Sequence, residues 1–284
     1  MPVPAAADPA LGVSLALGAA VVFGLGSAAQ QRVVARVRAD AALVREPQWT
    51  AGVAAVGVGT ALQLTALAFA PVALVQPLGV TSVLVAASAA RHRLDRTSVL
   101  GAVACAGGLA GFLLLARPGP ALPGAVATEG AGALAVLLVV ALVVALVAAR
   151  HSTGEVRAVA LGVAAGACYG ISAGLLTVVV AQVRLGGLAA ASVHPALYAA
   201  AVVGPAGFVL SQHAFRGARS AAPVLAVLTT VDPLVAVAVG VWWLGERIVA
   251  TPVALAGEAL AALAVLGGVV AVARGGARRA VVPA

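Results

Sequence analysis

Runs of apolar residues alternate along the chain with short segments that carry most of the Arg, Pro and other polar residues. A helix needs roughly 20 predominantly apolar residues to cross a hydrocarbon core of about 30 Å. Only helices and closed barrels satisfy their backbone groups in lipid, and runs of this length favour helices. We therefore predict an all-α polytopic membrane protein with nine transmembrane helices, near residues 11–31, 49–69, 72–90, 98–116, 131–149, 157–180, 195–214, 221–244 and 252–273.

The arginines give these nine spans a direction. All 17 basic residues are Arg, and short cytoplasmic loops accumulate positive charge. With the N-terminus outside and the C-terminus in the cytoplasm, 14 arginines lie on the inner side and three on the outer side. A shift of one span would mix the two groups, so the distribution predicts this orientation.

Composition agrees with a membrane protein. Hydrophobic residues make up 63% of the chain and charged residues 9%, with a mean hydropathy of +1.12, so the charges are too few to cover a soluble surface. The absence of Lys and Asn beside abundant Ala, Val, Gly and Leu indicates GC-rich coding, and hence a bacterial plasma membrane. The net charge of +8 does not predict nucleic-acid binding, because the arginines are scattered between apolar runs.

An internal repeat is suggested when the sequence is shifted against itself by 146 residues. Matched segments fall in three different spans: Leu15 with Leu161, Phe23-Gly24-Leu25 with Tyr169-Gly170-Ile171, Ala68-Phe69 with Ala214-Phe215, and Pro77 with Pro223. Five crossings separate the two copies, so they enter the membrane from opposite faces, as in many secondary transporters. We expect two inverted four-helix repeats, residues 1–116 and 150–284, joined by a linker and central helix at 117–149.

The eighth predicted span contains the sequence VDP near its middle. A carboxylate at mid-membrane costs a few kcal/mol unless it is paired, protonated or solvated, so Asp232 should face a cavity or a partner. Pro233 has no N–H for the carbonyl of Thr229, which predicts a helix break beside the hydroxyls of Thr229 and Thr230. Such a group of oxygen atoms suits a hard cation. In the repeat register Ala86 is the counterpart of Asp232, so the repeat itself does not require the acid.

A structural role for Asp232 stays open, because a protonated aspartate can bond to a backbone group at a broken helix. Glu258, in the ninth span, is the second predicted intramembrane acid, and the two acids could share one cation or one proton. Glu258 could equally form a bond between helices as a neutral acid.

Three further polar residues could line the same cavity. Gln63 lies in the second span, Gln76 precedes the predicted helix break at Pro77 in the third, and Tyr169 lies in the sixth. Polar side chains also bond membrane helices to one another, so each of the three has a structural alternative. Outside the spans, Glu246 and Arg247 predict a helix-terminal ion pair or cap.

Other types of site are not predicted. The two cysteines lie in separate apolar runs and the four histidines are scattered near membrane ends, so no metal centre built from them and no cofactor is expected. The pattern GLGSAA in the first span resembles a dinucleotide-binding turn, but it follows no strand. Metal binding is therefore predicted only for Asp232 and Glu258.

Several segments together resemble the drug/metabolite transporter superfamily with EamA-type repeats. They are GLGSAAQQRVV ending the first span, ALAFAPVALVQPLGVTSVL across the second and third, and HAFRGARSAAPVLAVLTTVDPLVAVAVGVWWLGERI across the seventh and eighth. The final LGER is similar to the Gly-Glu-Arg that ends the fourth helix of those repeats, whereas the first half carries RHRLDR there. The double glutamine, the Gln-Pro and the nine spans are closer to the NIPA-type branch, which implies magnesium transport.

The leading hypothesis is a secondary transporter that works by alternating access, with a divalent cation such as Mg²⁺ as its cargo and Asp232 as the central ligand. A proton-coupled exporter of a small metabolite is the alternative. A membrane-embedded enzyme or lipid-handling protein belongs to a third class, but no convergent nucleophile and base are visible for an enzyme. The expected partners are the substrate and the bilayer, and the sequence leaves a homo-oligomer open.

Overall fold

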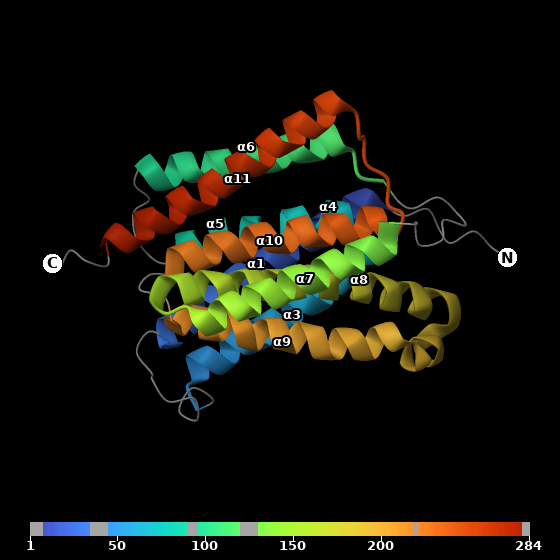
Figure 1. The fold of residues 1–284 in the computed structure, drawn as a ribbon, viewed down its shortest axis with the longest axis horizontal. Coiled ribbons are helices and arrows are strands. Elements are labelled where there is room, and N and C mark those ends of the chain that lie inside the picture. The colour runs from blue at the N-terminus through green and yellow to red at the C-terminus, as the bar shows by residue number, and fades with distance from the viewer. Residues whose placement is uncertain (1–7, 35–44, 90–95, 120–129, 218–220, 280–284) are drawn as a thin grey trace.

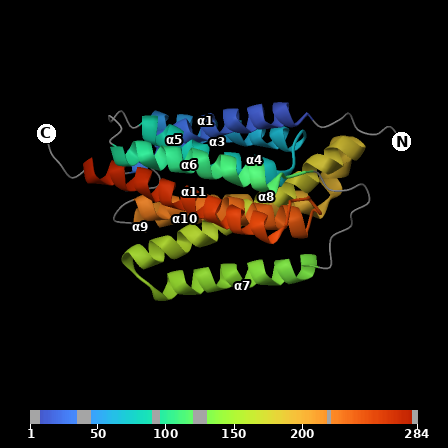
Figure 2. The same ribbon diagram turned by 90° about the horizontal axis from the view of Figure 1, so that it is seen from above.

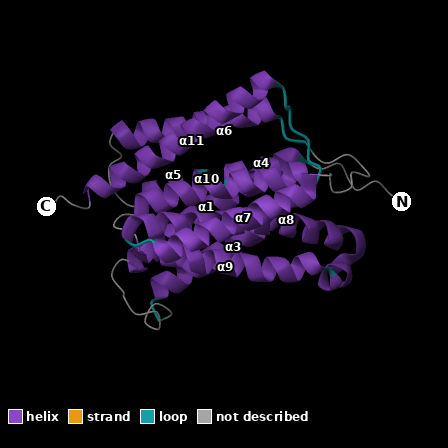
Figure 3. Cartoon of the chain, in the orientation of Figure 1, coloured by secondary structure: helices purple, strands orange, loops and turns teal. Residues whose placement is uncertain are grey.

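The chain is almost entirely helical in its computed structural model, which describes residues 8–34, 45–89, 96–119, 130–217 and 221–279. Within these ranges there is no strand, and a single β-bridge joins Gly119 to Arg247 (Figure 3). The helices are α1 (Pro9–Val34), α3 (Pro47–Leu67), α4 (Val72–Leu78), α5 (Thr81–Ala89), α6 (Arg96–Ala116), α7 (Gly130–His151), α8 (Gly154–Val193), α9 (Pro195–Gly217), α10 (Ala221–Trp242) and α11 (Pro252–Arg279).

Six of the described helices are long and apolar enough to cross a membrane, namely those in Pro9–Gln30, Pro47–Leu67, Gly132–His151, Val156–Val193, Pro195–Gly217 and Pro252–Ala271. Two shorter apolar stretches follow, Val103–Ala116 and Val227–Trp242. These helices fit a polytopic membrane protein, while the count of nine spans stays a prediction. Residues 35–44, 90–95 and 218–220, which carry several of the counted arginines, and residues 120–129 of the expected linker lie outside the described ranges.

The predicted helix breaks differ from what the structure contains. The third predicted span consists of two short helices, because α4 ends one residue after Pro77 and α5 begins at Thr81. By contrast, α10 stays helical through Pro233. A proline costs a helix one backbone hydrogen bond but does not prevent neighbouring helices from holding its two halves in line. The clearest interruption is at Gly186 and Gly187 in α8, where Gly187 has a φ of 69° that favours glycine.

Figures 1 and 2 show how the helices are arranged. All run roughly along one direction, and α6 and α11 form a pair at one edge of the bundle in Figure 1. In the view of Figure 2, α7 lies at one margin, α1 and α3 lie near the opposite one, and α10 lies between them. The contacts place α1 against α3 and α5, and α8 against α9, α10 and α7. The short helix α4 packs mainly against α10, with further contacts to α1.

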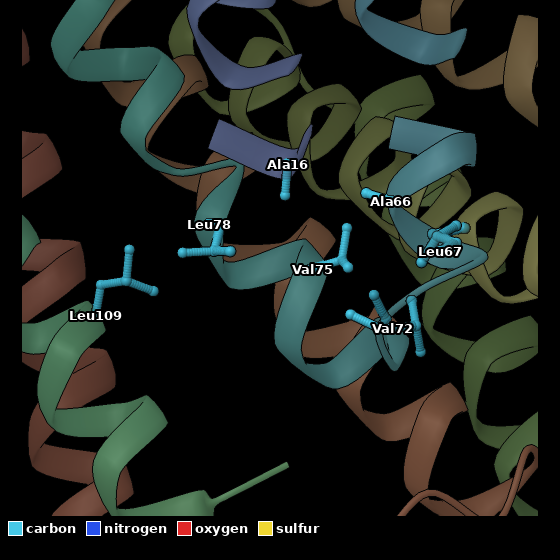
Figure 4. Packing of buried hydrophobic residues seen from close by; sticks show 10 residues of the cluster. Ala16, Ala66, Leu67, Val72, Val75, Leu78 and Leu109 are labelled. Atoms are coloured by element: carbon cyan, nitrogen blue, oxygen red, sulfur yellow. The ribbon is translucent and has the colours of Figure 1, made fainter. Parts of the chain in front are cut away.

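The largest buried apolar cluster surrounds α4. Val72, Val75 and Leu78 lie on successive turns of this helix, and Figure 4 shows them beside Ala16 of α1 and Leu109 of α6. Val72 and Val75 are almost completely inaccessible to solvent. The core thus centres on the helix that contains Gln76 and Pro77, which are themselves buried.

Glycines bring α6 and α11 close together. A Cβ atom on Gly108 would lie 2.6 Å from the carbonyl oxygen of Ala261, and one on Gly268 would lie 2.7 Å from the backbone nitrogen of Cys105. The thiol of Cys105 also donates to the carbonyl oxygen of Val265 at 3.5 Å. Close backbone approach through small residues is a common mode of helix packing in membranes.

We expect Gly108→Ala to destabilise the protein, because the added methyl group overlaps the α11 backbone. Overpacking of this kind costs about 1–3 kcal/mol, which should lower the apparent Tm in detergent by at least about 2 °C. The matched control is Gly107→Ala, since a Cβ on Gly107 meets no atom within 4 Å. Equal apparent Tm values for the two variants would contradict this packing.

Candidate functional site

Asp232 lies where the backbone of α10 packs directly against α8. A row of glycines at every fourth position of α8, Gly162, Gly166, Gly170 and Gly174, faces α10. A Cβ on Gly166 would lie 3.2 Å from the backbone nitrogen of Asp232, and one on Gly170 only 2.6 Å from its carbonyl oxygen. Residues four apart lie on one face of a helix, so this row allows the two backbones to meet directly. The backbone of Asp232 is therefore held against α8 on both sides of its Cα atom.

One side-chain oxygen of Asp232 has no hydrogen-bond partner in the described part of the chain. Its Oδ1 atom is buried and accepts no hydrogen bond from any residue that the structure describes. A buried acceptor without a partner is costly, and in a membrane no bulk water replaces the lost bond. Thr229 and Thr230, on the preceding turn of α10, are partly buried, and both already interact with other groups.

Tyr169 connects this region to α9. Its hydroxyl lies 3.3 Å from Oγ of Ser211, and Ser211 in turn donates to the carbonyl oxygen of Phe208 at 2.7 Å. Because the serine proton is used in that bond, Tyr169 must be the donor of the pair. Tyr169 directly precedes Gly170, whose Cβ atom would lie 2.6 Å from the carbonyl oxygen of Asp232, so Tyr169 and Asp232 belong to the same contact between α8 and α10. Ser211 was not among the predicted site residues.

The two predicted glutamines lie in the first part of the chain. Gln76 is buried in α4, which packs against α10, whereas Gln63 is partly buried on α3. Neither donates a hydrogen bond to the buried oxygen of Asp232. Gln76 is therefore placed on a helix that contacts α10, while Gln63 lies on a helix that packs mainly against α1.

Glu258 lies on α11, and the main neighbour of α11 is α6. The side chain is 8% exposed, and its Oε1 atom is buried without a hydrogen-bond partner among the described residues. No interaction joins its carboxyl group to that of Asp232 within the described part of the chain. Nor do three or more His, Cys, Asp or Glu side chains gather into a metal-binding group there. A cage built from both acids therefore has no direct contact to support it.

Glu246 contrasts with both acids, because its carboxylate is satisfied. It lies in the loop after α10, is 7% exposed, and accepts two backbone hydrogen bonds at the start of α4, from Val72 N–H at 2.6 Å and from Ala73 N–H at 2.8 Å. Burial raises the pKa of Glu246 above the ordinary glutamate value, and these two bonds oppose the shift. The expected cap is present, but the helix it caps belongs to the first part of the chain.

A cavity of about 210 Å³ opens between the start of α8 and the end of α9. It is lined by Thr153, Gly154, Arg157, Leu161, His213 and Gly217, from the start of α8 and the end of α9. Its lining includes none of the predicted site residues.

Comparison with known families identifies the first half of the chain. The family model described as "Magnesium transporter NIPA" matches residues 7–151, which is just over half of the sequence. No curated protein and no solved structure matches the chain. The match covers α1 to α7, whereas Asp232 and Tyr169 lie beyond it.

The hydrogen bonds from Tyr169 to Ser211 and from Ser211 to Phe208 predict that the two hydroxyl groups contribute unequally to the stability of the protein. Ser211→Ala should destabilise the protein by about 1–3 kcal/mol, because it leaves the tyrosine hydroxyl without its acceptor. Tyr169→Phe should cost only about 0.5–1.5 kcal/mol, because Ser211 keeps its bond to the Phe208 carbonyl oxygen. Denaturant midpoints in detergent measure both variants, and a larger loss for Tyr169→Phe would show that the donor has been assigned wrongly.

Proposed function

Because the chain belongs to the NIPA magnesium transporter family, we propose that it is a secondary transporter that carries Mg²⁺ across the membrane by alternating access. Asp232 is the central anionic ligand of the ion in this proposal. The observation that carries it is the buried Oδ1 atom of Asp232, which no described residue satisfies. A hard cation supplies what such an oxygen lacks, and oxygen atoms are the ligands that Mg²⁺ prefers.

The neighbouring groups complete the proposed ion path. Thr229 and Thr230 lie one turn before Asp232 and already interact with other groups, so they take a supporting place in this proposal, and Mg²⁺ commonly keeps several of its water molecules. Few direct protein ligands are therefore needed, which agrees with a single acid at the centre. Gln76 and Tyr169 line the path beside Asp232 in this proposal.

Glu258 and Gln63 take a secondary place. Glu258 has a buried oxygen without a partner, but its helix packs against α6 and its carboxyl group does not interact with that of Asp232. We assign it to a second position along the path rather than to one cage with Asp232. Gln63, on α3, lines the path from the side of the first half.

The packing of the helices supports an inverted repeat. In the first half α1 packs against α3 and α5, and in the second half α8 packs against α9 and α10. Gly24 and Gly170, which the 146-residue shift aligns, make matching contacts. A Cβ on Gly24 would lie 2.5 Å from the carbonyl oxygen of Ser82, and one on Gly170 would lie 2.6 Å from that of Asp232.

This equivalence gives Asp232 a different counterpart from the one in the sequence alignment. Ser82 and Asp232 are 150 residues apart, whereas Gly24 and Gly170 are 146 apart. The match between α5 and α10 is therefore shifted by four residues, or about one helical turn, relative to the match between α1 and α8. The counterpart is then Ser82 rather than Ala86. Either residue is uncharged, so the acid belongs to the second half alone.

The orientation in this proposal rests on the distribution of the arginines. Nine spans with the N-terminus outside place 14 of 17 arginines on the cytoplasmic side of a bacterial plasma membrane. Alternating access would then open Asp232 in turn to the outer and to the cytoplasmic side of the membrane.

A proton-coupled metabolite exporter is the second candidate, and a specific observation favours it. Asp232 stands without another acid in contact among the described residues, and a single buried carboxyl group is sufficient to carry one proton. The two candidates differ in what the carboxyl group binds.

Asp232→Asn should reduce Mg²⁺ flux into proteoliposomes at least about tenfold, because the neutral amide removes the negative charge while it keeps the size of the side chain. The same variant should lose the rise in apparent Tm that Mg²⁺ gives to the parent protein, since a ligand stabilises the state to which it binds. Asp8→Asn is the matched control, because Asp8 is exposed and only caps the start of α1.

The outcome separates the two candidates. If Asp232→Asn leaves Mg²⁺ flux unchanged but abolishes a proton-coupled flux, Asp232 carries a proton and the magnesium proposal is wrong. Glu258→Gln should lower the flux without removing the Mg²⁺-dependent rise in apparent Tm, as expected for a position outside the central cage.

A further inference from the structure

The loop after α10 reaches across the molecule to the start of α4. The carboxylate of Glu246 accepts hydrogen bonds from Val72 N–H and Ala73 N–H, which lie 174 and 173 residues away in the sequence. These are the first two residues of α4, whose N–H groups have no acceptor within their own helix. A negative charge at the start of a helix is also favourable for its dipole. The second half thus completes a helix of the first half.

The same loop is attached at two further points. The backbone N–H of Glu246 donates to the carbonyl oxygen of Gly240, near the end of α10, at 2.9 Å. Arg247 and Gly119 exchange two backbone hydrogen bonds at 2.8 and 3.0 Å, and Val249 N–H donates to the carbonyl oxygen of Ala116 at 2.8 Å. The loop therefore ties the end of α10 to the end of α6 as well as to the start of α4.

Gly240 leaves the room that this contact requires. A Cβ atom at position 240 would lie 2.6 Å from Oε2 of Glu246 and 2.8 Å from Cγ1 of Val72. Both distances are too short for real atoms, so any larger residue would push the carboxylate away from α4. The contact is close on every side, and Val72 is completely buried.

The position of this contact matters because α4 also packs against α10. Gln76 and Pro77 follow Glu246's two donors by one turn, and α10 carries Asp232 and Pro233. In the proposed transport cycle, an opening between the halves at this end of the bundle would separate α4 from α10, and the two hydrogen bonds from α4 to Glu246 would have to break first.

We propose that Glu246 is a positioning residue that latches the two halves together at this end of the bundle and must release α4 before the site can open there. The need for an opening rests on the proposed transport function, whereas the latch is a property of the resting structure. It can therefore be tested without any measurement of transport.

The test measures distances between spin labels on the purified full-length protein, with Cys105 and Cys168 replaced by alanine. One label pair, at Leu11 and Val253, spans the two halves at the Glu246 end, where both positions are exposed. A second pair, at Thr97 and Val156, uses exposed positions at the start of α6 and of α8, at the opposite end.

Glu246→Gln should add a population with a longer distance to the first pair, because an amide has one acceptor oxygen for two N–H donors. We expect the ratio of long to short distances to rise at least about tenfold, which corresponds to ~1.4 kcal/mol. Gly240→Ala should have the same effect with Glu246 intact, and it replaces Glu246→Gln if that variant does not fold.

Glu46→Gln is the matched control, since Glu46 precedes α3 but its side chain makes no capping bond. An unchanged first pair in both Glu246→Gln and Gly240→Ala would overturn the latch. Longer distances in both label pairs would also overturn it, because they would indicate general loosening of the bundle. If the latch holds but Asp232→Asn leaves Mg²⁺ flux unchanged, only the proposed function fails.

Discussion

Direct backbone contact at glycine is the interaction on which this bundle depends. Lipid is as apolar as leucine, so burying hydrophobic side chains between membrane helices adds little stability, and close packing must hold the helices together. Gly26 and Gly52 bring α1 to α3, Gly108 brings α6 to α11, and Gly166 and Gly170 bring α8 to α10. At each of these positions a methyl group would crowd a neighbouring backbone atom. The dispersion attraction between two atoms at this range is small, but its sum over a whole helix pair is large.

The buried acids fall into two kinds once these glycine contacts are in place. Glu246 has a hydrogen-bond donor for each carboxylate oxygen and contributes to the architecture. Asp232 has its backbone held by two glycines, while Oδ1 of its side chain is left unsatisfied by the described residues. A buried polar group without a partner is unfavourable in the resting protein, and this is the observation from which the proposed ligand role of Asp232 starts. Glu258, on α11, likewise has a buried oxygen that no described residue satisfies.

The apolar runs, the acid within a greasy helix and the family resemblance could all be obtained from the sequence. Each depends on local composition or on short motifs, and the family match to residues 7–151 agrees with the resemblance. The prolines were less informative. Pro77 is followed by a gap between α4 and α5, whereas α10 continues through Pro233. The difference arises because neighbouring helices, and not the proline ring alone, decide whether a helix stays in line.

The sequence by itself determined that this protein is helical and suited to a membrane, because twenty apolar residues in succession have no other stable arrangement in lipid. It also singled out Asp232 and suggested a cap at Glu246. Only the tertiary structure decided which groups meet: that Glu246 caps α4 rather than its own helix, that Tyr169 donates to Ser211, and that the buried oxygens of Asp232 and Glu258 do not bond to each other. Such contacts join residues up to 174 positions apart, and no local pattern of residues encodes them.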